Sequence, residues 1–326
     1  TNNVSLSGGG GVDMYGTGSL VNCLVANNTA GNVGGLSMRS NNRETADSGS
    51  DIINCTIVNN TQKNTNNPQF CGVRLDVRNN PNRAFVNNVV YGNTINGEVQ
   101  AQELGGYPQG YGKFLNNAVA GTTANVTYIQ LDAENAPQFN ENYSFAWTSP
   151  LYNAGSNDAL AYFVGDKDVY GNVRKQGENI DLGAVEHTVH TLTVAAVENG
   201  TLALKVLEQT MPLEAKAYEV PAGFTATILA TPAEKYALES ILLNGSVLAA
   251  VEDVYTLPAV QSDVTLGATF VSIPDTPTAL ENIMDMSNVV AVYDLLGHQV
   301  NATPANLTSG LYIVVTTQGT HKISIK

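Results

Sequence analysis

The sequence predicts an all-β protein in which a parallel β-helix over residues 1–187 is followed by two small β domains. Three observations predict this fold. A pattern of an apolar residue, an asparagine and further apolar residues returns as VNCLVANN, INCTIVNN and VNNVVYGN. A second pattern, seen as GVDMY, GLSMR and GVRLDV, alternates with period two, as short strands with one buried face do. Asparagine and glycine fill the intervals, and no stretch of this segment has helical periodicity.

The repeat is about 30 residues long. Its asparagines Asn22, Asn54, Asn87 and Asn116 are separated by 32, 33 and 29 residues. A unit of short strands cannot bury its apolar side alone, but stacked copies can. Asparagine tolerates the left-handed backbone of a sharp turn, and its amide can hydrogen-bond the equivalent amide in the next copy. We therefore expect these asparagines to be structural.

Composition excludes some functions. The chain has 326 residues, 43% of them hydrophobic, and a net charge of −14, which argues against nucleic acid as a partner. No apolar run is long enough to span a membrane. Because the chain opens with TNNVSLSGGGG, we expect a fragment or processed form that lacks its natural N-terminus and N-terminal coils.

The cysteines and histidines show no metal-binding spacing. Cys23 and Cys55 occupy the same slot of two repeats, and small buried residues are a better interpretation than a disulfide. The four histidines, His187, His190, His298 and His321, are interpreted as ordinary surface or packing residues. The GGGG run at residues 8–11 lacks the GK[ST] of a phosphate loop, so nucleotide binding is not expected.

The end of the first segment carries SPLYNAGSN, residues 149–157, and DVYGNVRKQGENIDLGAVE, residues 168–186. These stretches resemble the closing motif of bacterial surface proteins of the choice-of-anchor type, within the pectate-lyase-like right-handed parallel β-helix superfamily. The slots of that motif are filled by Asp168, Gly171, Arg174, Asp181, Gly183 and Glu186. We expect Arg174 to pair with Asp181 or Glu186 and close the last coil. The sequence requires no cofactor, and Ca²⁺ on these carboxylates is the weaker alternative.

Residues 188–272 have a different composition, with predicted strands in HTLTVAAV and around TATILATP and with ENG and LNG as turn signals. Thr225 to Pro232 and Tyr236 resemble a bacterial module related to internalin B-repeats, although Lys235 replaces the usual glycine. The resemblance implies a spacer or a weak adhesive unit.

The last part of the chain comprises a proline-containing linker, residues 273–283, and a small β domain, residues 284–326. VYDLLG, LTSGLYIV and the basic final stretch KISIK closely resemble the type A C-terminal sorting domain of the type IX secretion pathway of Bacteroidota. That resemblance implies a β-sandwich-like fold, contact with secretion machinery, and a secreted or outer-membrane location.

Period two also predicts an outward face on the GVDMY, GLSMR and GVRLDV strands. If Val12, Met14, Leu36, Met38, Val73, Leu75 and Val77 point inward, their neighbours point out. Stacking then gives two columns, Asp13 with Ser37 and Arg74, and Tyr15 with Arg39 and Asp76. The catalytic candidates are Arg74, Asp76, Arg39 and Asp13, and the substrate-binding candidates are Tyr15 and Arg78.

These columns contain the groups that polysaccharide chemistry uses. A lyase needs a base and cations to neutralise a uronate, which Arg39, Arg74 or a bound Ca²⁺ could supply. A glycosidase needs two carboxylates, and Asp13 and Asp76 lie two strands apart, or roughly 9.6 Å. The alternative is that these side chains only form ion pairs on a solvated face.

One aromatic group offers a further site. Trp147, the only tryptophan, lies near Tyr143, Phe145 and Tyr152 in the sequence. Together they could form a stacking platform for sugar rings, but burial against the last coil is the favoured interpretation.

The favoured hypothesis is a secreted or cell-surface protein that interacts with a polysaccharide or surface glycan without complete catalytic machinery. We expect it to be a monomer. One alternative is a polysaccharide lyase or glycoside hydrolase that acts on the outer face. The other is an adhesin or structural stalk.

Overall fold

The structure is a computed structural model that describes residues 1–40, 49–64, 71–123, 125–162, 166–207, 209–273, 289–301, 306–317 and 319–325. Nearly all of the predicted linker, residues 273–283, lies outside these residues. The chain divides into two compact units. The first comprises Thr1–Val197, Leu202–Leu229 and Ile241–Ala268, and the second comprises Glu198–Thr201, Ala230–Ser240 and Thr269–Lys326. The domain boundaries expected from the sequence stay a prediction.

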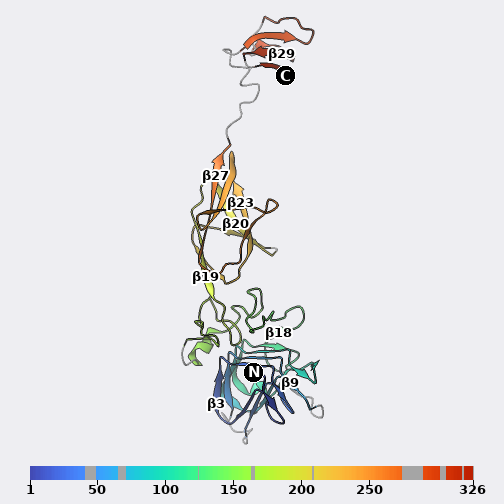
Figure 1. The fold of residues 1–326 in the computed structure, drawn as a ribbon, viewed down its shortest axis with the longest axis vertical. Coiled ribbons are helices and arrows are strands. Elements are labelled where there is room, and N and C mark those ends of the chain that lie inside the picture. Colours follow the sequence, from blue (N-terminus) through green and yellow to red (C-terminus); the bar gives the residue numbers. More distant parts are fainter. Residues whose placement is uncertain are drawn as a thin grey trace. The chain divides into compact units, whose positions relative to one another are not determined.

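Four sheets of short strands are formed by described residues between Val4 and Leu131 (Figure 1). Their strands run in the order β1-β5-β9-β13-β14, β15-β10-β6-β2, β16-β11-β7-β3 and β18-β17-β12-β8-β4. All their pairings are parallel except the one between β13 and β14. The all-β class and the parallel pairing are therefore confirmed.

The bounds of these strands follow the repeat. The first sheet contains β1 (Val4–Ser5), β5 (Thr29–Ala30), β9 (Thr61–Gln62), β13 (Thr94–Ile95) and β14 (Glu98–Val99). The second contains β2 (Val12–Tyr15), β6 (Leu36–Arg39), β10 (Val73–Asp76) and β15 (Leu104–Gly106). The third contains β3 (Gly18–Val21), β7 (Ser50–Ile53), β11 (Asn80–Val86) and β16 (Tyr111–Leu115). The fourth contains β4 (Leu24–Ala26), β8 (Thr56–Val58), β12 (Val89–Tyr91), β17 (Ala118–Ala120) and β18 (Ile129–Leu131).

The core between these sheets is made by the residues that the alternation places inward. Leu36, Met38, Val73, Leu75 and Val77 are fully buried in one cluster, and Val12 and Met14 pack against it. Cys55 belongs to the same cluster, and Cys23 is partly buried beside it. The predicted inward face is confirmed. Each strand pairs with the equivalent strands of the neighbouring repeats. Its backbone N–H and C=O groups therefore stay hydrogen-bonded while its apolar side chains are buried on a common side.

Buried asparagine ladders run along the stack of repeats. The backbone N–H and the Nδ2 of Asn28 both donate to Oδ1 of Asn60, at 3.0 and 2.8 Å. Asn60 donates in the same way to Asn93, and Asn93 donates to Oε2 of Glu103, at 2.9 and 2.7 Å. Each amide accepts from one repeat and donates to the next, so a polar side chain is fully satisfied inside the stack. Glu103 ends the ladder, because its carboxyl oxygens accept the N–H groups of Gly92 and Asn93 and no further asparagine of the described residues follows.

The four asparagines that define the repeat in the sequence have a different structural role. Asn22, Asn54, Asn87 and Asn116 have φ values of 50°, 49°, 58° and 48°, so the predicted left-handed turns are confirmed. Only Asn87 donates to an equivalent amide, that of Asn54. The prediction of amide bonds from copy to copy is therefore wrong for most of this column. Its side chains donate instead to carbonyl oxygens of a later segment, those of Lys167, Asp181, Gly183, Ser156 and Ala154.

That later segment, residues 132–187, is called the closing segment below. Within its described residues it has one 3₁₀ helix, η2 (Asn157–Tyr162), and no strand longer than an isolated bridge. Elsewhere in the described residues a second 3₁₀ helix, η1 (Pro108–Gly110), precedes β16. The asparagine column thus fixes an irregular stretch against a regular one.

Antiparallel strands dominate after residue 188. One sheet has the order β22-β19-β27-β24-β25 and the other β21-β20-β23-β26. Their strands are β19 (Val189–Val194), β20 (Gly200–Val206), β21 (Gln209–Leu213), β22 (Ala217–Pro221), β23 (Ala226–Pro232), β24 (Tyr236–Leu243), β25 (Ser246–Leu248), β26 (Tyr255–Leu257) and β27 (Val264–Ser272). The LNG signal closes the β24–β25 hairpin, with φ of 51° at Asn244 and 77° at Gly245. The ENG signal is a turn between strands of different sheets, so it does not form a hairpin.

The final sheet lies in the second unit, with β29 between β28 and β30. Its antiparallel strands are β28 (Val289–Asp294), β29 (Gly310–Thr316) and β30 (Gly319–Ile325). Val292, Leu307, Val314 and Ile323 form a small core of their own. Within the part of the chain that the structure describes, no helix is long and apolar enough to cross a membrane.

Candidate functional site

The register confirms the two predicted columns on β2, β6 and β10. Asp13 pairs with Ser37, which pairs with Arg74. Tyr15 pairs with Arg39, which pairs with Asp76. The columns are not equally open, since Tyr15 is 59% exposed whereas Ser37 and Asp76 are 2% and 5% exposed.

Ion pairs occupy the charged members of these columns. Nε of Arg39 donates to Oδ1 of Asp13 at 3.1 Å, and its Nη2 pairs with Oδ2 of the same carboxylate. Nη2 of Arg74 lies 3.0 Å from Oδ2 of Asp76. Each carboxylate that could act as a base or nucleophile therefore faces an arginine, which is the arrangement of a structural pair.

The remaining candidates lie beside the columns. The guanidinium of Arg78 lies 4.9 Å from the centre of the Tyr107 ring, as in a cation–π contact. The glycine run lies against Asp13, because a Cβ on Gly8 would come within 2.6 Å of Oδ2. Gly8 also has a φ of 72°. These glycines serve close packing and a left-handed turn.

The cysteines are free thiols. Cys55 and Cys71 are buried and Cys23 is partly exposed. A hydrogen bond with the Cys55 thiol lowers the pKa of Cys23 to about 7. The interpretation of small packing residues holds for Cys55, which lies in the core cluster.

The closing motif forms a buried network around Arg174, which is 0% exposed. Its Nη2 donates to the carbonyl oxygens of Asp181 and Gly183 at 2.8 and 2.6 Å. Its Nε lies 3.6 Å from Oε2 of Glu186. The expected pairing is thus confirmed with the carboxylate of Glu186, whereas Asp181 contributes its main chain.

The other carboxylates of the motif accept backbone N–H groups. Asp168 accepts from Tyr170, Asn172 and Glu186 at 2.8 to 2.9 Å. Asp181 accepts from Asn153 and His187 at 2.6 and 2.7 Å. Among the described residues, no cluster of histidine, cysteine or carboxylate side chains has the arrangement of a metal site.

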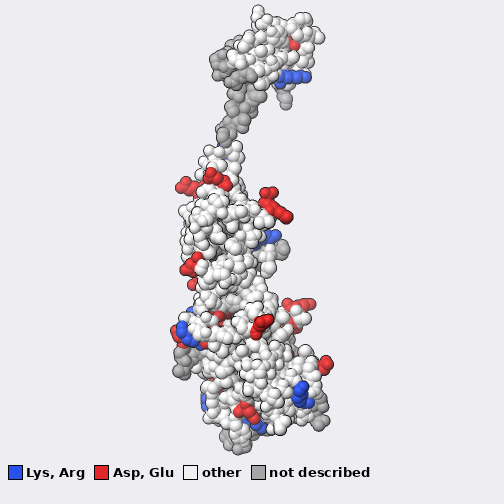
Figure 2. All heavy atoms as spheres, in the orientation of Figure 1, with Lys and Arg blue, Asp and Glu red and all other residues white. Residues whose placement is uncertain are grey.

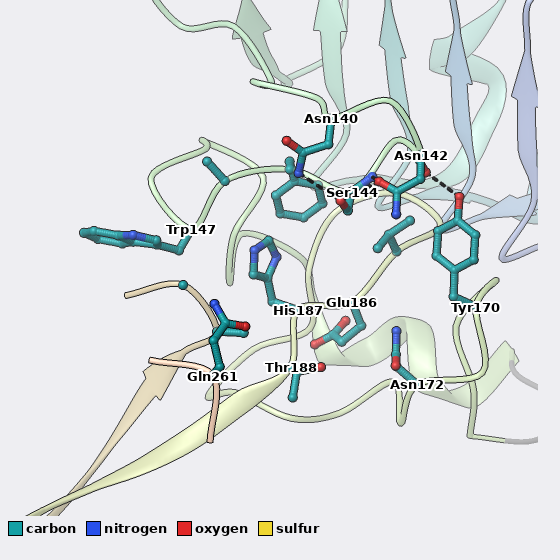
Figure 3. Close-up of a pocket in the computed structure, with 15 residues that line it drawn as sticks. Asn140, Asn142, Ser144, Trp147, Tyr170, Asn172, Glu186, His187, Thr188 and Gln261 are labelled. Carbon is teal, nitrogen blue, oxygen red and sulfur yellow. Dashed lines mark hydrogen bonds between the residues drawn. The ribbon is translucent and has the colours of Figure 1, made fainter. Parts of the chain in front are cut away.

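A pocket of about 670 Å³ lies at this end of the first unit (Figure 3). Its lining comes from residues 140–147, from Tyr170 and Asn172, from residues 185–188, and from Ala222, Gly223 and Gln261. In Figure 3, Trp147 and Tyr170 lie on opposite sides, with Glu186 and His187 between them. A volume of this size suits a small organic ligand.

Hydrogen bonds fix the wall formed by residues 140–144. Nδ2 of Asn140 donates to Oγ of Ser144 at 3.0 Å, and that hydroxyl donates to Oδ1 of Asn142 at 2.7 Å. The hydroxyl of Tyr170 donates to the carbonyl oxygen of Asn142. The wall therefore keeps its shape without a ligand, which lowers the entropic cost of binding.

Aromatic packing fixes the other groups. The Trp147 ring packs on Phe224, with 5.1 Å between centroids. The His187 ring lies 4.8 Å from Phe145 and 5.5 Å from Tyr152. Phe145 is 3% exposed, whereas Trp147 is only partly buried. The interpretation of burial therefore holds for Phe145, while Trp147 presents part of its ring to the pocket.

Charge in the pocket is low. Of the residues that line it, Glu186 is the one carboxylate, and none is lysine or arginine. Burial raises the pKa of Glu186, the charge of Asp181 raises it further, and Arg174 opposes both. Figure 2 shows the same scarcity of charge on the face that it draws, where basic and acidic groups are scattered among uncharged residues.

Sequence reasoning identified Trp147 as a candidate platform and missed its partners. Tyr170, Asn172 and Glu186 belong to the closing motif, which was interpreted as a fold terminus, and His187 was interpreted as an ordinary histidine. Asn140, Asn142 and Gln261 carried no signal, because isolated amides in loops have no recognisable spacing.

No known protein family, curated protein or solved structure matches this chain. Its function must therefore be inferred from the geometry of its own residues.

Proposed function

We propose that the chain is a secreted or cell-surface protein that binds carbohydrate in the pocket around Trp147 and Tyr170, without complete catalytic machinery. The observation that carries this proposal is the pocket itself, with two aromatic side chains on opposite sides and amide and hydroxyl groups between them. Sugar rings present C–H faces that stack on aromatic rings and hydroxyls that need donors and acceptors. The described lining supplies both kinds of group.

The proposed architecture is a right-handed parallel β-helix. Its support is that the parallel strands of each of the four sheets follow the order of the repeats, with equivalent strands of successive repeats side by side. Such a stack offers a rigid base for irregular loops, and here the asparagine column holds the closing segment that carries most of the pocket.

The proposed location rests on the C-terminal region. VYDLLG and LTSGLYIV resemble a type IX sorting domain, and we propose export or surface display on that basis. A further support is that β28, β29 and β30 of the second unit enclose a core of their own.

The test is a binding screen against soluble polysaccharides by isothermal titration calorimetry. Trp147→Ala should weaken binding by at least about tenfold, because the stacking face is lost, and Trp147→Phe should retain most of it. Arg74→Ala on the columns is the matched control and should leave affinity unchanged. Absence of binding to every polysaccharide in the screen would refute the proposal.

A polysaccharide lyase or glycoside hydrolase is the second candidate. It is favoured by the register that brings Asp13, Arg39, Arg74 and Asp76 onto one sheet. An enzyme there would release unsaturated products or new reducing ends, and Arg74→Ala combined with Asp76→Ala would abolish their release. The ion pairs of these residues favour the binding protein.

A further inference from the structure

The pocket has no permanently charged cation for an acidic sugar, because its lining contains neither lysine nor arginine. The imidazole of His187 lines the pocket, but its Nδ1 lies 3.5 Å from Oδ2 of Asp181, which would balance a positive charge on this ring. Arg174, the arginine of the closing motif, is 0% exposed and is engaged by two carbonyl oxygens and by Glu186. A uronate carboxylate that left water here would lose its hydration without gaining an ion pair, which is costly.

Glu186 makes the pocket still less suited to an anion. It is the single carboxylate of the lining, and its Oε2 accepts the backbone N–H of Asp181 at 3.0 Å. Whether it is protonated or ionised, it offers no positive charge. An anionic ligand would also approach a chain whose net charge is −14.

Uncharged hydrogen-bonding groups are available instead. Within the described residues, the structure records no hydrogen bond for the side chains of Trp147, Thr188 and Gln261, although all three line the pocket. They carry an indole N–H donor, a hydroxyl and an amide with both donor and acceptor. A sugar hydroxyl, which both donates and accepts, matches this set.

We propose that the pocket binds an uncharged glycan segment and discriminates against uronic acids. This inference rests on the proposed function and narrows its ligand class. The ring faces of neutral sugars would stack between Trp147 and Tyr170, and their hydroxyls would bond to Thr188 and Gln261.

The experiment uses the fluorescence of Trp147, which reports on the pocket because the chain has no other tryptophan. The full chain is titrated with neutral hexasaccharides of glucose, mannose, galactose and N-acetylglucosamine. It is also titrated with hexagalacturonate and with its methyl ester, which has the same sugars without the charge. We expect a neutral hexasaccharide to change the emission, and the methyl ester to bind at least about tenfold more tightly than hexagalacturonate.

Two variants sharpen the result. Tyr170→Ala should weaken the neutral ligand, since it removes one aromatic side. Gln261→Lys should raise the affinity for hexagalacturonate by about tenfold, because it adds the missing cation at an exposed position.

The outcomes separate the two proposals. If hexagalacturonate binds as tightly as its methyl ester and changes the emission, the inference is wrong while carbohydrate binding in the pocket stands. If ligands bind without changing the emission, and Tyr170→Ala has no effect, the pocket is not the site and the inference also fails. If no oligosaccharide binds, the proposed function fails and the inference fails with it.

Discussion

The strand-built part of the first unit and the closing segment bond their buried polar groups in different ways. In the described part of residues 4–131, one row of buried amides recurs from repeat to repeat and bonds to its own copies, as Asn28, Asn60 and Asn93 do. In residues 132–187, single residues such as Arg174 hold loops that do not recur. Asn28 and Asn60 each donate to the copy in the next repeat, so one residue type satisfies a whole row. Most residues that line the pocket belong to this irregular segment, whose side chains have no copies in the repeats.

Substitution of Arg174, which holds the loops of the closing segment, should cause the largest loss of stability. Arg174→Met retains much of the buried volume but leaves Glu186 and two carbonyl oxygens without their cation. We expect a loss of about 3–5 kcal/mol in the free energy of unfolding, measured by urea denaturation. Lys167→Ala, at an exposed position in the same segment, is the control and should change little. A loss below about 1 kcal/mol would show that the motif is not what closes the fold.

The asparagine ladder is tested by Asn60→Ala. Asn60 is fully buried and makes side-chain bonds to Asn28, Asn93 and the carbonyl oxygen of Val25. Its removal should cost about 3 kcal/mol, since several buried groups lose partners at once. The neighbouring Asn59 has an exposed side chain and a φ of 55°, so Asn59→Gly should be nearly neutral. Equal effects in the same denaturation assay would contradict the ladder.

Glu103, where the ladder ends, should make stability depend on pH. Burial raises its pKa from 4.5 to about 7, against the opposing effect of the N–H groups of Gly92 and Asn93. The folded state therefore binds more protons than the unfolded state between these values. The stability that Glu103 contributes is full below pH 4.5 and declines as pH rises to 7, by on the order of 3 kcal/mol.

The measurement compares unfolding curves of the protein and of Glu103→Gln from pH 4 to 8. The variant should be less stable below pH 4.5, since its NH₂ group faces N–H donors, and the gap should narrow toward pH 7. Glu98→Gln, at an exposed position, should keep a constant offset. A constant gap for Glu103→Gln would mean that folding does not raise the pKa of the Glu103 carboxyl.

The same contrast explains which features the sequence could predict. Alternation in GVDMY and GLSMR was sufficient to assign Met14 and Met38 to the core and Asp13 to an outer column, because period two is a property of the strand itself. Asn22 and Asn54 could be assigned to turns for a similar local reason. Their bonding partners could not, since the carbonyl oxygens of Lys167 and Asp181 are more than 100 residues away. The pocket depends on several such contacts between residues far apart in the sequence. Among its residues, Trp147 could be singled out as a binding candidate because its residue type is rare.

The smallest expected effect concerns the ion pairs of the columns. Arg39 and Asp13 have side chains that are 41% and 31% exposed, so water screens their attraction. In a double-mutant cycle with Asp13→Asn and Arg39→Gln, we expect a coupling energy of about 0.5 kcal/mol, and less at high salt. A coupling above about 2 kcal/mol would mean that the pair is held rigidly and desolvated. The columns would then resemble a preorganised site, and this result would favour the enzyme hypothesis over the binding-protein hypothesis.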